Sequence, residues 1–182
     1  MSRTLERGFT LGELLIALAV VGISLTIAVP GFNDLMNNNR RRAAVNEFVS
    51  TLHVARSEAI TRNQRVTVCP TAAGATCEAV AWNQGWLAFV DVNSDQTVSP
   101  GEQVVSHVEQ KPRVDINSAE FGAFLMFRPN GRMMVANAAQ NSGEATFCDP
   151  RGAQHARVVI ISSSGLPRLS KTTTAGGAPA CP

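Results

Sequence analysis

Apolar residues are distributed unevenly along the chain, and their pattern first predicts a membrane segment. Residues 1–8 are polar and carry Arg3 and Arg7, whereas residues 9–29 are apolar apart from a few small or polar positions and one carboxylate, Glu13. As an α-helix, the apolar stretch would be about 30 Å long, which matches the hydrocarbon thickness of a bilayer. The pattern therefore predicts a short basic leader followed by a single transmembrane segment.

The same helix is expected to continue beyond the apolar stretch. From Val45 onward, apolar residues recur at spacings of three and four, the stripe of an amphipathic helix. The stripe consists of Val45, Phe48, Val49, Leu52, Ala55 and Ala59. A helix from Thr10 to Arg62 would be about 80 Å long, so half of it is expected to project from a domain of this size. Residues 30–63 are the predicted amphipathic half, which ends near Asn63.

After residue 63 the apolar runs shorten to the length of β-strands. The predicted strands are residues 66–69, 86–90, 104–108, 124–127, 145–148 and 156–161. Turn-forming residues separate them, and no segment between them is long and periodic enough to be a crossover helix, so mostly antiparallel pairing is expected. The sequence therefore predicts an α+β fold, with one long N-terminal helix packed on a β-sheet domain of residues 64–182.

Composition and motifs narrow the classes of function. Charged residues are 16% of the chain, below the soluble average of about 25%, in keeping with a segment that avoids water. A net charge of +2 is too small to indicate nucleic acid or an anionic surface as a partner. The sequence has no nucleophile elbow, zinc-protease, Walker or dinucleotide motif, and its three histidines are scattered. We therefore expect neither an enzyme nor a cofactor.

The four cysteines are expected to form two disulfides. Their sequence contains no Cys-x-x-Cys pair and no histidine at zinc-finger spacing. Disulfides are the default in an exported domain. Proximity favours Cys69–Cys77, which would close a short loop, and Cys148–Cys181, which would anchor the tail.

The N-terminus differs from an ordinary secretory signal. Such a signal carries small residues at the C-terminal end of its apolar stretch, whereas here Gly8 precedes the stretch. A lone carboxylate inside a membrane is costly, so Glu13 needs a cationic partner. That partner is expected to be the free amine of Phe9 on a neighbouring subunit, which exists only after the bond following Gly8 is cut.

The segment Arg7-Gly8-Phe9-Thr10-Leu11-Gly12-Glu13-Leu14-Leu15 resembles the type III signal of type IV pilins and type II secretion pseudopilins. The resemblance implies cleavage between Gly8 and Phe9 and N-methylation of Phe9 by a prepilin peptidase. It also makes Glu13 the fifth residue of the mature chain and implies a role for it in assembly. Pro30 falls where pilins commonly place a helix-kinking proline.

Five further segments resemble the GspH/FimT family of minor pilins and H-type pseudopilins. They are residues 55–59, 85–89, 91–102, 127–131 and 161–165. The resemblance implies a structural subunit that primes or caps a type IV pilus, with other pilin or pseudopilin subunits as partners; a pseudopilin of the type II secretion system is the alternative. The basic leader predicts a single-pass protein of the bacterial inner membrane, with residues 64–182 in the periplasm.

One loop has the spacing of a calcium-binding loop. Six oxygen-bearing residues occupy places 1, 3, 5, 7, 9 and 12 of such a loop: Asp91, Asn93, Asp95, Thr97, Ser99 and Glu102. Gln96 replaces the glycine of the sharp turn, Pro100 stiffens the loop, and the flanking segments are predicted strands. The loop is either a calcium site, in a binding domain tethered by the anchor, or an Asx-rich hairpin turn.

A basic segment near the C-terminus raises the alternative of a DNA-binding minor pilin for natural transformation. Some FimT-type relatives capture DNA through a Gly-Arg-X-Arg motif, and the corresponding stretch here, residues 165–168, reads Gly-Leu-Pro-Arg. Arg168 and Lys171 remain as candidate DNA contacts. Phosphate binding needs several such contacts acting together, and the residues that are able to join them are Arg113, Arg151 and Arg157.

Overall fold

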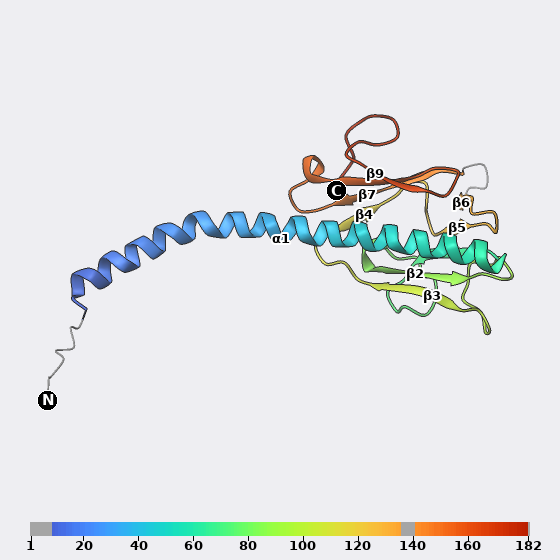
Figure 1. The fold of residues 1–182 in the computed structure, drawn as a ribbon, viewed down its shortest axis with the longest axis horizontal. Coiled ribbons are helices and arrows are strands. Elements are labelled where there is room, and N and C mark those ends of the chain that lie inside the picture. Colours follow the sequence, from blue (N-terminus) through green and yellow to red (C-terminus); the bar gives the residue numbers. More distant parts are fainter. Residues whose placement is uncertain (1–8, 136–140, 182) are drawn as a thin grey trace. The chain divides into compact units, whose positions relative to one another are not determined.

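The computed structural model of the protein describes residues 9–135 and 141–181 (Figure 1). The side chains of Ile27, Ala28 and Pro30 are not described, and Gly8 and the rest of the leader lie outside the described residues. The chain divides into two compact units, Met1–Asn38 and Asn39–Pro182, here called the N-terminal unit and the globular unit. Each is described by itself.

The helix α1 spans Leu11–Arg62, and local chemistry explains both of its ends. At the start, the Thr10 side chain accepts a hydrogen bond from the Glu13 amide, while the Glu13 carboxylate accepts one from the Thr10 amide, which is a capping box. At the end, Asn63 takes a left-handed conformation with φ 52°. The amides of Asn63 and Gln64 then donate to the carbonyls of Ile60 and Ala59, as in a Schellman motif.

The strands form two antiparallel sheets, five-stranded and four-stranded, among the described residues (Figure 1). The first has the order β3-β2-β1-β5-β6 and consists of β1 Val66–Pro70, β2 Gly85–Val90, β3 Val104–Glu109, β5 Leu125–Phe127 and β6 Met133–Val135. The second has the order β4-β7-β8-β9 and consists of β4 Asp115–Asn117, β7 Gly143–Cys148, β8 Arg157–Ile161 and β9 Pro167–Ser170. Two short 3-10 helices, η1 Trp82–Gln84 and η2 Ala153–His155, complete the described elements.

The α+β expectation is confirmed, and the second sheet is the main difference from it. The sequence pattern predicted one sheet and missed β4, β6 and β9, each of three or four residues. All three are edge strands. In β4 and β9 the exposed side of the edge strand breaks the continuous apolar run that reveals a buried strand. β6 is apolar and largely buried, but three residues are too short a run to indicate a strand. In β9, for example, Arg168 and Leu169 are both exposed.

The predicted helical stripe lies against both sheets, and Phe48 is its central residue. Its ring centroid lies 5.4 Å from that of Trp86 in the five-stranded sheet and 5.5 Å from that of Phe147 in the four-stranded sheet. Of the stripe, Val45, Phe48, Leu52, Ala55 and Ala59 are buried, and Val49 is partly buried. One helix face therefore joins the two sheets into a single hydrophobic core.

Candidate functional site

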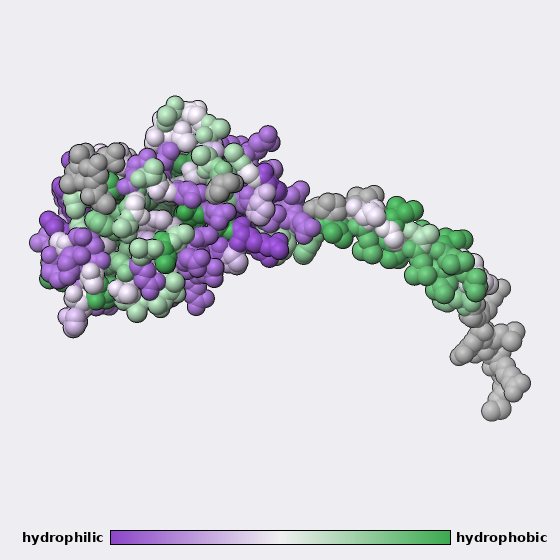
Figure 2. All heavy atoms as spheres, turned by 180° about the vertical axis from the view of Figure 1, so that it is seen from behind, coloured by the Kyte–Doolittle hydropathy of each residue, from purple (hydrophilic) through white to green (hydrophobic). Residues whose placement is uncertain are grey.

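Apolar side chains are exposed along much of the described part of the N-terminal unit (Figure 2). The large apolar side chains that the structure describes between Leu11 and Leu35 are at least half exposed, from 52% at Val21 to 77% at Leu11. The helix is long and apolar enough in this part to cross a membrane. Exposed apolar area of this extent is unfavourable in water. The segment therefore requires lipid or other apolar helices around it.

Glu13 is a charged residue near the N-terminal end of this apolar surface, and Asp34 is a second one near its other end. Glu13 is held by its own chain. Its Oε2 atom accepts hydrogen bonds from the amide and the hydroxyl of Thr10, both at 2.9 Å. Sequence reasoning assigned Glu13 to assembly but missed Thr10, although Thr-x-x-Glu at the start of an apolar run is the sequence signature of a capping box. The cap fixes the carboxylate close to Phe9, whose side chain is 92% exposed.

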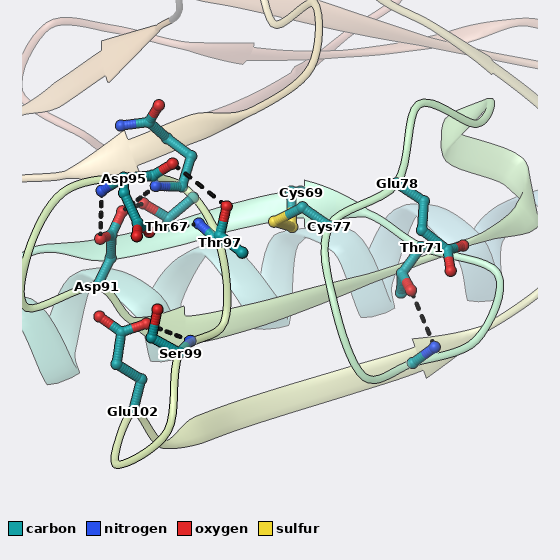
Figure 3. The surroundings of a disulfide bond; sticks show 12 residues. Thr67, Cys69, Thr71, Cys77, Glu78, Asp91, Asp95, Thr97, Ser99 and Glu102 are labelled. Atoms are coloured by element: carbon teal, nitrogen blue, oxygen red, sulfur yellow. Dashed lines mark hydrogen bonds between the residues drawn. A yellow bond between two sulfur atoms is a disulfide. The ribbon is translucent and has the colours of Figure 1, made fainter.

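The predicted calcium loop connects β2 to β3, and three of its carboxylates converge (Figure 3). Oxygen atoms of Asp91, Asp95 and Glu102 lie within 4.8 Å of one another. Gln96 adopts φ 60°, the left-handed conformation for which the sequence lacked a glycine. The backbone therefore makes the sharp turn although the sequence has glutamine and not glycine at this position.

The carboxylates of this loop accept hydrogen bonds from the loop itself. Asp91, which is fully buried, accepts hydrogen bonds from the Thr67 hydroxyl at 2.7 Å and from the amides of Asp95 and Gln96 at 3.1 and 3.2 Å. Glu102 accepts from two further amides of the loop. These bonds are those of an Asx-rich hairpin. Calcium binding at Asp91, Asn93, Asp95, Thr97 and Glu102 stays a prediction.

Both disulfides join the cysteines that the spacing favours. Cys69 in β1 is bonded to Cys77 (Figure 3), and Cys148 at the end of β7 is bonded to Cys181. The second bond fastens the C-terminal tail, residues 171–181, which also binds β7 through a hydrogen bond of 2.6 Å from the Thr174 amide to Glu144. Between the tail and the neighbouring strands lies a hollow of about 430 Å³.

Three of the segments that carry the family resemblance meet around Arg56. Its Nε atom donates to the carbonyl of Gly131 at 3.1 Å and to that of Ser164 at 3.4 Å. Gly131 and Gly165 have φ of 73° and 76°, and a Cβ atom added to Gly165 would lie 2.2 Å from the Gly131 carbonyl oxygen. Glycine is thus required at 165 by both conformation and space. The cluster attaches α1 to the turns beside both sheets.

Replacing Gly165 with alanine should destabilise the globular unit by more than about 3 kcal/mol, because the new methyl group meets the backbone carbonyl oxygen of Gly131, which cannot move aside. Gly152→Ala is the matched control, since Gly152 also has a left-handed φ, 84°, but a Cβ atom there meets nothing within 4 Å. It should cost about 1 kcal/mol. Urea denaturation followed by tryptophan fluorescence measures both, and equal losses would show that crowding at Gly165 is unimportant.

A buried ion pair connects the start of the globular unit to β7. Arg41 in α1 pairs with Asp149, and Arg151 donates to the same carboxylate at 2.7 and 3.0 Å. Burial opposes ionisation of Asp149, but the hydrogen bonds and charge of Arg151, together with the charge of Arg41, lower its pKa to about 2. For Arg41, burial lowers the pKa most; Asp149 raises it, and the charges of Arg157 and Arg151 lower it.

Acid should therefore weaken the globular unit over a defined range of pH. Asp149 has a folded-state pKa of about 2, below its ordinary value of 3.8, so its contribution is complete above about pH 4 and is lost as the pH falls toward 2. The loss should be about 2 kcal/mol, measured as a falling urea midpoint. Asp149→Asn should be less stable at pH 7 and should lack this part of the pH dependence. An unchanged slope in that variant would contradict the assignment.

The candidate DNA contacts are exposed but are not gathered into one patch by the structure. Arg168 lies in the edge strand β9, opposite Ile160, and Lys171 follows the end of that strand. Arg151 and Arg157 lie instead beside Arg41, in the cluster described above. DNA binding through Arg168 and Lys171 stays a prediction.

Known proteins match this chain over most of its length. Residues 44–165 match the family model of type II transport protein GspH, and residues 3–29 match that of the prokaryotic N-terminal methylation motif. The chain is 32% identical over 175 residues to the pilin-like protein PilA1 of Thermus thermophilus, covering 90% of this chain and 98% of that protein.

Solved structures with a similar fold include the type IV minor pilin FimU of Pseudomonas aeruginosa. Its TM-score is 0.57 at 18% sequence identity, over 78% of this chain and 93% of that one. The minor pseudopilin EpsH from the type 2 secretion system of Vibrio cholerae has a TM-score of 0.49 at 12% identity, over 72% of this chain and 96% of that one.

Proposed function

The chain belongs to the GspH family of type II transport proteins, a family of minor pilins and pseudopilins, and from this membership we propose that it primes or caps a type IV pilus. The observation that carries the proposal is the exposed apolar surface of the N-terminal unit with Glu13 inside it. Such a surface is hidden from water when the helices of several subunits pack together. The proposed role is structural, and no reaction of this chain is part of it.

Before assembly, the apolar segment would anchor the chain in the bacterial inner membrane. The flanking charges do not determine its orientation alone, because Arg3 and Arg7 precede the segment while three arginines, residues 40–42, follow it. The two disulfides support a periplasmic globular unit, since such bonds form and persist in that compartment and are rare in the cytosol. The leader would then lie on the cytoplasmic side, and the prepilin peptidase would cut it there after Gly8.

Assembly is proposed to pair Glu13 with the free amine of Phe9 on a neighbouring subunit. Removing an isolated carboxylate from water costs several kcal/mol unless a cation compensates it. The mature amine is a cation that processing creates at the same depth as Glu13. Thr10 supports this pairing because its two hydrogen bonds fix the carboxylate near the start of the helix.

Membership in a pilus, as opposed to a secretion pseudopilus, is supported by the full-length similarity to a pilin-like protein and by the disulfide-fastened C-terminal tail. The test is deletion of the gene with complementation by the wild-type chain. Deletion should reduce the number of surface filaments and leave secretion of exported enzymes unchanged, and the complementing chain should be recovered in sheared filaments. Lost secretion with normal pili would assign the chain to the secretion system.

A further inference from the structure

The globular unit carries a cluster of cations at the end where α1 enters it. The basic cluster, as we call it, consists of Arg40, Arg41, Arg42, Lys111, Arg151 and Arg157. Two carboxylates pair within it, Asp149 with Arg41 and Arg151, and Glu47 with Lys111. Six cations against two carboxylates leave an excess of four positive charges. Hydrophilic residues gather at this end of the globular unit in Figure 2.

A small hollow lies within the basic cluster. It measures about 150 Å³, and Arg40 and Lys111 contribute cationic groups to its lining. Ala43, Pro112 and Val114 supply an apolar part of the same lining. The hollow therefore combines two cations with apolar carbon, which suits a molecule that carries a phosphate next to hydrocarbon.

The position of the basic cluster in the chain favours a membrane lipid as that molecule. The predicted transmembrane segment ends at Val29, and Leu35, which is 53% exposed, is the last large apolar residue of the N-terminal unit that is at least half exposed. Arg40 lies five residues beyond Leu35 and eleven beyond Val29 on the same helix, about 8 Å and about 16 Å along the axis, whatever angle the two units adopt. The headgroup layer on one side of a bilayer is about 5–8 Å thick. A chain anchored by this segment thus holds Arg40 either within the headgroup layer or just outside it, where its long side chain can extend toward the lipids.

We propose that the basic cluster binds the phosphate groups of anionic phospholipids on the periplasmic face of the inner membrane. This inference rests on the membrane anchoring proposed above, but not on membership in a pilus. Bound lipid would hold the globular unit at the membrane surface until the subunit is extracted into a filament. Arg40, Arg42 and Lys111 make the direct contacts, and the Arg41–Asp149 pair fixes the helix on which two of them lie.

The test uses the full-length mature chain, purified in detergent, with native mass spectrometry to count bound lipids. Phosphatidylglycerol and phosphatidylcholine with identical acyl chains are the probes. A cation near an anionic lipid surface contributes about a fivefold gain in affinity. The wild-type chain should therefore retain phosphatidylglycerol in clear preference to phosphatidylcholine. The combined substitutions Arg40→Gln, Arg42→Gln and Lys111→Gln should lower its affinity for phosphatidylglycerol up to about 100-fold.

Two matched variants control for charge and folding. Arg65→Gln, Arg132→Gln and Arg168→Gln together remove the same charge from exposed positions outside the basic cluster and should keep the preference. The second variant combines Arg40→Lys, Arg42→Lys and Lys111→Arg, which keep the charge of the basic cluster. It should keep the preference for phosphatidylglycerol as well. Circular dichroism checks that every variant is folded.

Three outcomes would overturn the proposal: equal retention of the two lipids by the wild-type chain, preference that survives the three cluster substitutions, or equal loss in the control at residues 65, 132 and 168. A different outcome is that the wild-type chain shows no lipid preference but binds a double-stranded oligonucleotide, and that the three cluster substitutions remove this binding. The cluster would then serve nucleic acid instead. Recovery of the chain in sheared filaments is measured separately, so failure here leaves the proposed function standing.

Discussion

Replacing Gly8 with glutamate should leave the chain at precursor size, with its N-terminus uncut. The methylation motif matches this part of the chain. The proposed prepilin peptidase would have to approach the bond after Gly8, where glycine has no side chain to obstruct it. A charged side chain at Gly8 should obstruct that approach and abolish nearly all cleavage. Migration of the variant beside wild type on a gel, with mass spectrometry of the N-terminal peptide, measures the effect.

Glu6→Ala is the control for this experiment, because it also changes the leader but leaves Gly8 and Phe9 in place. It should be cut normally. If the Gly8→Glu protein still begins at Phe9, the assignment of the leader is wrong, and with it the origin of the free amine that Glu13 is proposed to meet.

Replacing Glu13 with alanine should yield a processed, membrane-held chain that is depleted from sheared filaments at least about tenfold. Without the carboxylate, the amine of Phe9 is left as an uncompensated cation in the helix bundle, which costs several kcal/mol. A simple anchor would behave in the opposite way, since alanine enters a membrane more easily than glutamate. Quantitative immunoblotting of filament and membrane fractions measures the ratio.

Glu13→Gln separates the charge of this residue from its capping role. Glutamine keeps an oxygen that can accept the hydrogen bonds of Thr10 but removes the negative charge. If inter-subunit pairing is correct, Glu13→Gln should be depleted as strongly as Glu13→Ala. Wild-type recovery of the glutamine variant, with depletion of the alanine variant, would show that the residue acts by capping α1.

Local pattern was sufficient to predict the helix and its end but not the way the sheets close around it. The stripe from Val45 to Ala59 marks the buried face because helical spacing is repeated in the sequence itself. Asn63 suits the left-handed position that ends the helix. The short edge strands carry no such repeat, and their pairing depends on neighbours far along the chain.

The same distinction holds for the candidate sites. The disulfide pairing could be predicted because only a few pairings exist and proximity favours one of them. The Arg41–Asp149 pair could not, since the two residues are 108 positions apart and neither stands in a recognisable motif. Arg56 was noted as part of a family segment, but its contacts with Gly131 and Ser164 depend on tertiary structure.

Because α1 belongs to both units, tension on a filament would enter the globular unit along the axis of a helix. To extract the helix, the buried stripe would have to slide past both sheets at once. The contacts of the stripe would then be loaded together, in shear, and would not break one after another. Among the described side chains of α1, Arg41 is the first buried one from the N-terminal end, and it pairs with Asp149, whose neighbour Cys148 is bonded to Cys181. A pull on the N-terminal part of α1 would thus be transmitted through Arg41 and Asp149 to the Cys148–Cys181 disulfide.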